Sequence, residues 1–204
     1  MDIITGTRKI FFESIVISLG DNHIRHLPQN QQYDNEKAIK KKKKRHRMLT
    51  DINFMNMALD EARKAFDQDE VPVGAVLVQD GHVLAQSHNA PVAGNDASAH
   101  AEMLAIRKAC AIAGNYRLNG AELFVTLEPC IMCAGAILQA RLARVVFGAR
   151  DPKAGAVCSL YHILTDNRLN HQVDVTEGIL REECGEILSR FFREKRIRAE
   201  SAIK

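Results

Sequence analysis

The sequence predicts an α/β fold in three layers (α/β/α), with helices covering both faces of a central mixed sheet of five strands. Two observations lead to this prediction. Short apolar segments with strand character alternate along the chain with longer segments whose apolar residues recur at helical spacing. The length of 204 residues and the 46% hydrophobic content suit one compact domain with some chain left over. Strands and helices that alternate within one domain form a sheet covered by helices.

The chain left over lies at the N-terminus, in residues 1–47. Residues 1–50 hold 11 Lys and Arg against 5 Asp and Glu, whereas the rest of the chain holds 17 against 20. The five consecutive lysines at 40–44 repel one another, and such runs seldom fold. We therefore expect residues 1–47 to be a disordered basic extension and residues 48–204 to be the domain. Either translation starts at Met48 and the extension is not part of the native protein, or the extension is a basic arm for RNA phosphates.

The first element of the domain is predicted to be a helix that starts near Thr50. Thr50 or Asp51 can cap this start, and the apolar residues that follow share one helical face. These residues are Ile52, Met55, Leu59, Ala62 and Phe66.

A β-hairpin is predicted next. Residues 74–78 have the composition of a buried strand. Asp80 and Gly81 form a two-residue hairpin turn, and the return strand begins at His82. A loop rich in Gly, Asn, Pro and Asp then covers 89–98.

The remaining elements alternate between helix and strand. Gly114 is suited to end the first of these helices. The predicted helices cover 99–113, 129–141 and 177–199. The predicted strands cover 122–126, 144–148 and 172–175, with room for one short helix before the last strand.

Five cysteines, an odd number, argue against a disulfide framework and for a reducing compartment. The apolar stretch at 10–19 imitates a secretory leader, but Glu13 interrupts it and it is too short to span a membrane. We therefore expect a cytoplasmic protein without membrane attachment. Cys110, Cys158 and Cys184 are most simply small core or surface residues.

The other two cysteines, Cys130 and Cys133, follow Pro129 at the start of a predicted helix. Residues three apart on a helix share one face. The helix dipole there favours the thiolate form, which is the form that binds metal. Two thiolates supply half of a tetrahedral zinc shell, so this pair alone fits zinc, a redox pair or chance.

His100 and Glu102 supply what is missing. One imidazole and two thiolates give three protein ligands and leave the fourth zinc position open, as in catalytic sites. Residues two apart on a regular helix point about 200° apart. His100 must therefore open its helix, with Glu102 in the first turn, for both to flank one metal ion. Together with Cys130 and Cys133 they form the H-x-E…P-C-x-x-C signature of zinc-dependent nucleobase deaminases.

Beyond this signature, residues 48–198 resemble the bacterial tRNA-specific adenosine deaminases of the cytidine/deoxycytidylate deaminase superfamily. The resemblance rests on EVPVGAVLV at 70–78, AHAE at 99–102, NYRL at 115–118, VTLEPCIMCAGA at 125–136, RVVFGARD at 144–151, EGIL at 177–180 and FFR at 191–193. It implies a cytidine deaminase-like fold, one Zn²⁺ per subunit, a homodimer, and conversion of the wobble adenosine of a tRNA anticodon to inosine.

The resemblance also implies substrate contacts. By position, Asn89 should contact the flipped adenosine and Asp151 should lie against the nucleotide backbone. Without the family match, both would be interpreted as turn residues. Pro152 and Cys158, where the family commonly has a small residue and a glycine, depart from the pattern in the RNA-facing loop.

The last predicted helix carries cations interleaved with Phe191 and Phe192, which suits single-stranded RNA. Adjacent residues diverge by about 100° on a helix, so one phenylalanine can lie in the core while Phe192 borders the substrate. The alternative is a solvated cationic face with two core phenylalanines. The cations are Arg190, Arg193, Lys195, Arg196 and Arg198.

These parts imply a mechanism. Zinc lowers the pKa of a bound water toward about 7. Glu102 passes that water's proton to N1 of adenine as the oxygen attacks C6, and then protonates the departing amine. Two alternatives stay open: a deaminase of free guanine or cytosine, and a non-enzymatic subunit that binds RNA and keeps zinc for stability.

Overall fold

A computed structural model of the chain describes residues 29–202. The predictions for residues 1–28 lie outside this range. The chain divides into two compact units, residues 1–49 and 50–204. The described part of the first unit is helical, as the beginning of helix α2 (Gln29–Asp67).

For residues 29–47 the structure has a helix where the sequence predicts a disordered extension. Lys, Gln and Glu have high helix propensity, and a helix already nucleated at 50–67 can extend by one hydrogen bond per residue. Because the helix continues through Thr50, neither Thr50 nor Asp51 caps its start, and that prediction was wrong.

The second unit is built on a mixed sheet of five strands in the order β2-β1-β3-β4-β5. β1 pairs antiparallel with β2 and β3, whereas β3, β4 and β5 run parallel. The strands are β1 (Gly74–Gln79), β2 (His82–His88), β3 (Glu122–Leu127), β4 (Arg144–Ala149) and β5 (Asp174–Glu177).

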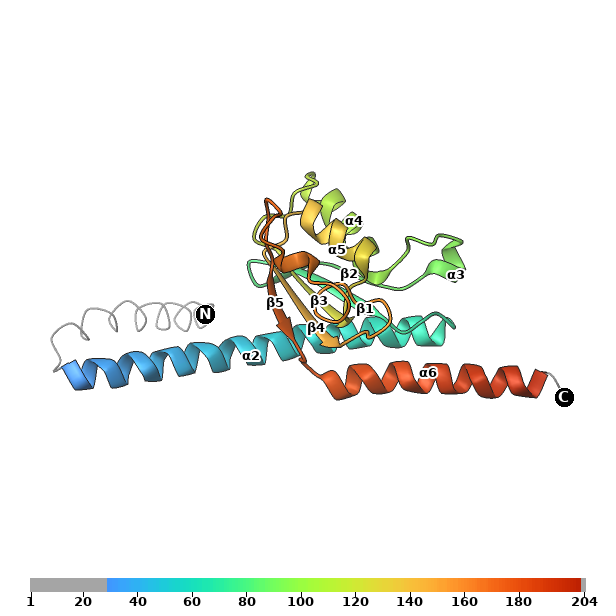
Figure 1. The fold of residues 1–204 in the computed structure, drawn as a ribbon, viewed down its shortest axis with the longest axis horizontal. Coiled ribbons are helices and arrows are strands. Elements are labelled where there is room, and N and C mark those ends of the chain that lie inside the picture. The colour runs from blue at the N-terminus through green and yellow to red at the C-terminus, as the bar shows by residue number, and fades with distance from the viewer. Residues whose placement is uncertain (1–28, 203–204) are drawn as a thin grey trace, which may run out of the picture. The chain divides into compact units, whose positions relative to one another are not determined.

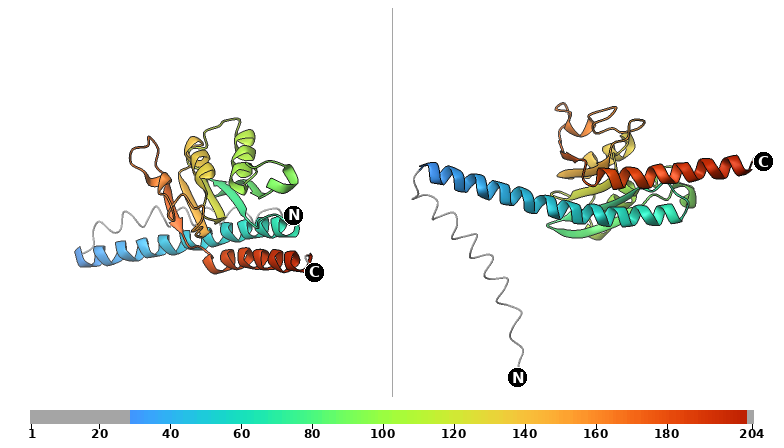
Figure 2. Two further views of the ribbon diagram at one scale, coloured as in Figure 1. Left: turned by 45° about the vertical axis from the view of Figure 1, so that its right-hand side comes forward. Right: turned by 90° about the horizontal axis from the view of Figure 1, so that it is seen from below.

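Each face of the sheet carries its own core, because alternate residues of a strand point to opposite faces. On one face, strand residues that include Leu77, Val125 and Phe147 pack with α4 (Ala101–Ala113) and α5 (Ile131–Gln139). On the other face, strand residues that include Val76, Phe124 and Val146 pack with residues 50–67 of α2 and with α6 (Arg181–Ala202). Figures 1 and 2 show the same division, which confirms the predicted three-layer fold.

The predicted hairpin turn and helix end are also confirmed. Asp80 (φ 51°) and Gly81 (φ 78°) both have positive φ, as a two-residue hairpin turn of the primed type requires. Gly114 (φ 60°) ends α4. Two short helices occur in the loops, α3 (Pro91–Gly94) and η1 (Ile163–Thr165).

Some boundaries differ from prediction. α6 begins at Arg181 rather than 177, because Gly178 and Leu180 have positive φ and form a turn that no helix can include. α5 begins at Ile131, so Pro129 precedes the helix instead of standing in its first turn. No helix within residues 29–202 is long and apolar enough to cross a membrane.

The topology brings several segment ends to one edge of the sheet. β3 and β4 both end there, since they run parallel. The start of β1 and the end of β2 lie at the same edge, where Gly74 is paired with His88 and Ala75 with Val125. Ligands of α/β proteins bind outside the carboxyl ends of strands, and the predicted site residues follow these ends in the chain.

Candidate metal centre and active site

The structure brings His100, Cys130 and Cys133 together at this edge. The Nδ1 atom of His100 lies 3.7 Å from the Sγ of Cys130 and 3.6 Å from the Sγ of Cys133. With Zn–S near 2.3 Å and Zn–N near 2.0 Å, ligand atoms of a tetrahedral zinc lie about 3.6 Å apart. The three donor atoms are therefore spaced to hold one Zn²⁺.

Two helix starts place these ligands. His100 is the N-cap of α4 and Cys130 the N-cap of α5, both in extended backbone conformation. Cys133 stands one turn later in α5 and is fully buried. The prediction that His100 must open its helix is confirmed.

The two thiols do not ionise alike. Hydrogen bonds from Cys133 and His100 lower the pKa of Cys130 to about 3. The pKa of Cys133 is raised, because its thiol donates to Cys130 and because burial and the nearby charges of Glu102 and Cys130 disfavour a second anion. A divalent cation bound by both sulfurs would offset these charges and stabilise both thiolates. The donor set thus fits zinc in charge as well as in spacing.

Glu102 lies in the first turn of α4, with only 4% of its surface exposed. Burial raises the pKa of this carboxyl, although the neighbouring His100 opposes the shift. A carboxyl with a raised pKa can both accept and donate a proton near neutral pH. Nothing in a purely structural zinc site needs such a group.

Asn89 directly follows β2 and is buried. Its Oδ1 accepts a hydrogen bond from the backbone N–H of Ala101 (2.8 Å), the residue after His100. Asn89, which is predicted to contact the base, is thus hydrogen-bonded to the first residue of α4, next to His100.

Asp151 lies in the loop after β4. Its Oδ1 accepts hydrogen bonds from the backbone N–H groups of Lys153 (2.9 Å) and Ala154 (3.2 Å), the bonding of a turn residue. The turn role considered from the sequence is therefore present, and one carboxylate oxygen is engaged in it.

Phe191 and Phe192 diverge on α6 as predicted. Phe191 is buried (5% exposed) and stacks edge-on against Phe66 of α2, whereas Phe192 is 45% exposed. Part of the positive charge of α6 is neutralised, since Lys195 and Arg198 pair with Asp69.

Glu128 is an important residue that the sequence analysis did not single out. It follows β3 in the chain, two residues before Cys130, and it is buried. Its carboxylate accepts hydrogen bonds from five donors in the loop after β4. These donors are the backbone N–H groups of Asp151, Val157, Cys158 and Ser159 and the hydroxyl of Ser159. A glutamate directly before Pro129 and Cys130 was the only available signal, and its partners lie more than 20 residues away.

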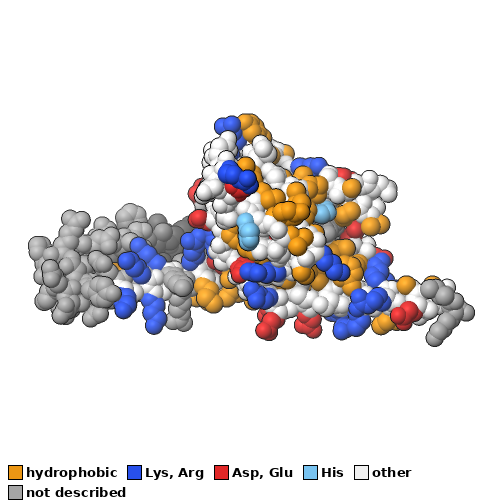
Figure 3. Space-filling model, in the orientation of Figure 1, with side chains coloured by type: hydrophobic (Ala, Val, Ile, Leu, Met, Phe, Trp, Pro, Cys, Tyr) orange, Lys and Arg blue, Asp and Glu red, His pale blue; other side chains and the backbone are white. Residues whose placement is uncertain are grey.

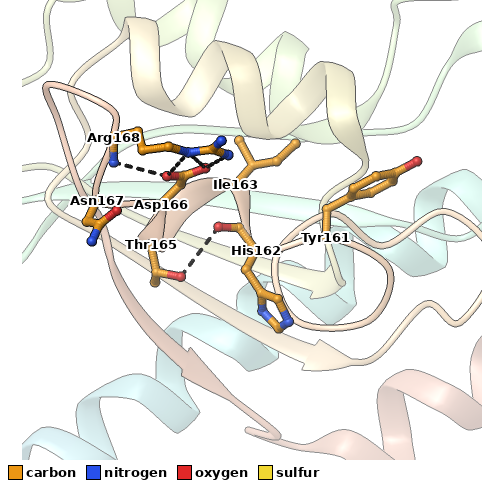
Figure 4. A pocket seen from close by; sticks show the side chains of 7 residues that line it. All are labelled: Tyr161, His162, Ile163, Thr165, Asp166, Asn167 and Arg168. Carbon is orange, nitrogen blue, oxygen red and sulfur yellow. Dashed lines mark hydrogen bonds and ion pairs between the residues drawn. The ribbon is translucent and has the colours of Figure 1, made fainter.

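A cavity of about 490 Å³ lies elsewhere, along the segment around η1 (Figure 4). Tyr161, His162 and Ile163 line one part of it, and Asp166 and Arg168, which form an ion pair, line another. None of the predicted site residues lines this cavity, so it is distinct from the cluster of His100, Cys130 and Cys133.

Comparison with known proteins agrees with this site. Residues 48–149 match the family model described as the cytidine and deoxycytidylate deaminase zinc-binding region. A tRNA-specific adenosine deaminase of Bacillus subtilis is 50% identical over 157 residues, 77% of this chain and 98% of the relative. One of Agrobacterium fabrum is 52% identical over 150 residues, 74% of this chain and 99% of the relative.

A solved structure is similar to this chain as well. It comes from a study of A-to-I editing by tRNA:A34 deaminases at the wobble position of transfer RNA. It is 51% identical, with a TM-score of 0.65, and the match covers 67% of this chain and 99% of that one. The chain therefore belongs to the zinc-binding cytidine and deoxycytidylate deaminase family and, within it, to the tRNA-specific adenosine deaminases.

Proposed function

We propose that this protein hydrolyses adenosine to inosine at the wobble position of tRNA anticodons. One observation carries the chemistry: three donor atoms spaced for zinc lie beside a buried carboxyl. Three protein ligands would leave the fourth position of a tetrahedral zinc ion for a reactant. The similarity to tRNA-specific adenosine deaminases supports adenosine in tRNA as the substrate.

In this proposal His100, Cys130 and Cys133 hold the zinc ion. When bound, zinc lowers the pKa of a water molecule and so supplies a nucleophile at neutral pH. Glu102 accepts the proton of the attacking water and delivers it to N1 of adenine while a C–O bond forms at C6. Glu102 then takes the proton of the new C6 hydroxyl and carries it to the amino group, the C6–N bond breaks as the C6 carbonyl forms, and ammonia leaves.

The base has to leave its stack to reach this site, which costs a few kcal/mol and is easiest in a loop such as an anticodon. We assign Asn89 to the extruded adenosine, Asp151 to the nucleotide backbone and Phe192 to the border of the substrate site. The Asn89 Oδ1 is bonded to Ala101, so its NH₂ group is the one available to the base.

The working unit in this proposal is a homodimer in the cytoplasm. Figure 3 shows hydrophobic side chains gathered near the middle of one face. Ile131 at the start of α5 and Leu160 in the loop after β4 are each more than half exposed. Exposed apolar side chains that gather on one face are typical of protein interfaces. The five free cysteines agree with a reducing compartment.

A deaminase of free guanine or cytosine is the alternative. Such an enzyme would share the zinc site but would have no use for exposed Phe192 among the cations of α6. Ammonia release should be measured with an anticodon stem-loop and with free guanine and cytosine. Sequencing of the treated RNA should show a wobble A-to-G change, since inosine is sequenced as G. Release from a free base, with none from the stem-loop, would overturn the proposal.

A further inference from the structure

A buried carboxylate, that of Glu61, joins α2 to the end of β2, next to the proposed substrate residue. The Nδ1 atom of His88 lies 2.9 Å from one carboxylate oxygen of Glu61, and Nζ of Lys64 lies 2.5 Å from the other. The side chain of Glu61 is 6% exposed and that of His88 is 23% exposed. An ionised carboxylate only accepts hydrogen bonds, so Nδ1 of His88 is the donor in its bond to Glu61.

The backbone is built closely around this pair. His88 is paired across the sheet with Gly74. A Cβ atom at Gly74 would lie 2.8 Å from the Cβ of Glu61 and 2.5 Å from the backbone nitrogen of Ala62. Only glycine therefore lets the start of β1 approach the turn of α2 that carries Glu61.

The contacts continue from His88 to the metal site. Asn89, the next residue, donates its backbone N–H to the carbonyl of Val73 (3.0 Å). Its Oδ1 accepts from Ala101, which follows His100. The position of Asn89 is thus fixed on one side by α4 and on the other by the strand end that Glu61 holds.

A buried carboxylate contributes little net stability, because desolvation offsets the attraction to its partners. The burial of Glu61 therefore calls for a role other than stability. We infer that Glu61 and His88 form a positioning pair, which orients Asn89 toward the base. This inference rests on the proposed function, because Asn89 is the residue through which the pair acts.

The experiment compares Glu61→Leu with Asp60→Leu, a matched control. Asp60 is the adjacent carboxylate on α2, exposed and paired with Arg63. We expect Glu61→Leu to lower kcat/KM for the anticodon stem-loop by about 10-fold to 100-fold, since small displacements of a positioning group have effects of this size. Zinc content should stay at one per chain, and Asp60→Leu should match the parent protein. Glu61→Gln keeps an acceptor for His88 and should restore most of the activity.

The decisive comparison repeats Glu61→Leu in an Asn89→Ala background. If the pair acts through Asn89, the second substitution has no further effect there, because coupled residues are not additive. An equal loss with and without Asn89, or no loss in either, would overturn the inference.

A second readout does not need activity. The side-chain NH₂ signals of Asn89 in an NMR spectrum, identified by their loss in Asn89→Ala, should move in Glu61→Leu and stay in place in Asp60→Leu. Unchanged signals in Glu61→Leu would overturn the positioning role even if the stem-loop proves not to be the substrate. A parent protein inactive on the stem-loop whose signals do move would refute the proposed function alone.

Discussion

Arg144 and Asp51 form a bidentate ion pair across 93 residues of sequence. The two nitrogen–oxygen distances are 2.7 Å and 2.9 Å, and both side chains are almost fully buried. The same guanidinium donates to Glu122 (2.8 Å) and to the hydroxyl of Thr176. These contacts raise the pKa of Arg144 in spite of its burial. One side chain on β4 thereby ties α2, β3 and β5 together.

Replacing Arg144 should destabilise the fold strongly. Arg144→Met leaves Asp51 buried without its partner, and we expect a loss of about 3–5 kcal/mol in the free energy of unfolding. Urea unfolding measures this loss. Arg150→Met, which removes an exposed pair with Glu177, is the control and should have a much smaller effect. The double variant Arg144→Met, Asp51→Leu should recover part of the lost stability; a further loss would contradict this explanation.

Glu102 can be separated from the metal site by substitution. Glu102→Gln keeps the shape of the buried side chain but cannot carry a proton, so turnover should fall by about 10²–10⁴-fold or more. Zinc content and the circular dichroism spectrum should not change. Full activity of this variant would rule out the proton-transfer role, and loss of zinc would mean that Glu102 supports the metal instead.

Zinc binding should depend on Cys133 and not on cysteines in general. Cys133→Ser should lose most of the metal, because a serine hydroxyl is a poor replacement for a thiolate ligand. Cys110→Ser, remote in the sequence from the ligand motif and only partly buried, is the control and should keep one zinc per chain. Zinc content is measured on the purified proteins by atomic absorption. A chelator should lower the melting temperature of the parent protein and leave that of Cys133→Ser unchanged.

The loop after β4 should not accept a side chain at Gly155. A Cβ atom there would lie 2.5 Å from Oε2 of Glu128 and 2.6 Å from the carbonyl oxygen of Asp151. We expect Gly155→Ala to reduce stability by about 1–3 kcal/mol, as overpacking does. Gly135→Ala is the control, since nothing lies within 4 Å of that position and alanine favours its helix α5. Equal stabilities of the two variants would show that the loop can move away from Glu128.

The chain that begins at Met48 should keep most of its activity, because all the proposed site residues lie at or beyond Asn89. We propose that residues 48–204 are the deaminase domain and that the basic segment before them is dispensable. The measurement is kcat/KM for the stem-loop at several salt concentrations. A large loss at low salt, with a smaller salt dependence in the shortened protein, would instead indicate that the lysines contact RNA phosphates.

The sequence was sufficient for those features that depend on near neighbours. Short apolar segments predict the strands, and Asp80 with Gly81 predicts the hairpin turn. The cluster of His100, Cys130 and Cys133 was also predictable, because the two cysteines lie three apart and because His100 can join them only from the start of its helix α4.

Other features depend on partners far away in the chain. Asp51 is a residue type that often caps a helix, and nothing near it in the sequence indicates Arg144 as its partner. The same holds for Glu61 with His88 and for Glu128 with its loop. The beginning of α2 also differs from the prediction, since charge repulsion in the lysine run predicts disorder and the structure has helix from Gln29 onward.

The hydrogen bonds of Glu128 to the loop after β4 have a consequence for which side chains that loop can carry. Four of its five bonds go to backbone N–H groups, which every residue except proline supplies. Pro152 stands at a position that donates nothing to Glu128, and Cys158 donates only through its backbone. The side chains at 152 and 158 can thus change without the loss of a bond to Glu128, whereas Gly155 and the hydroxyl of Ser159 are needed for the path of the chain beside Cys130.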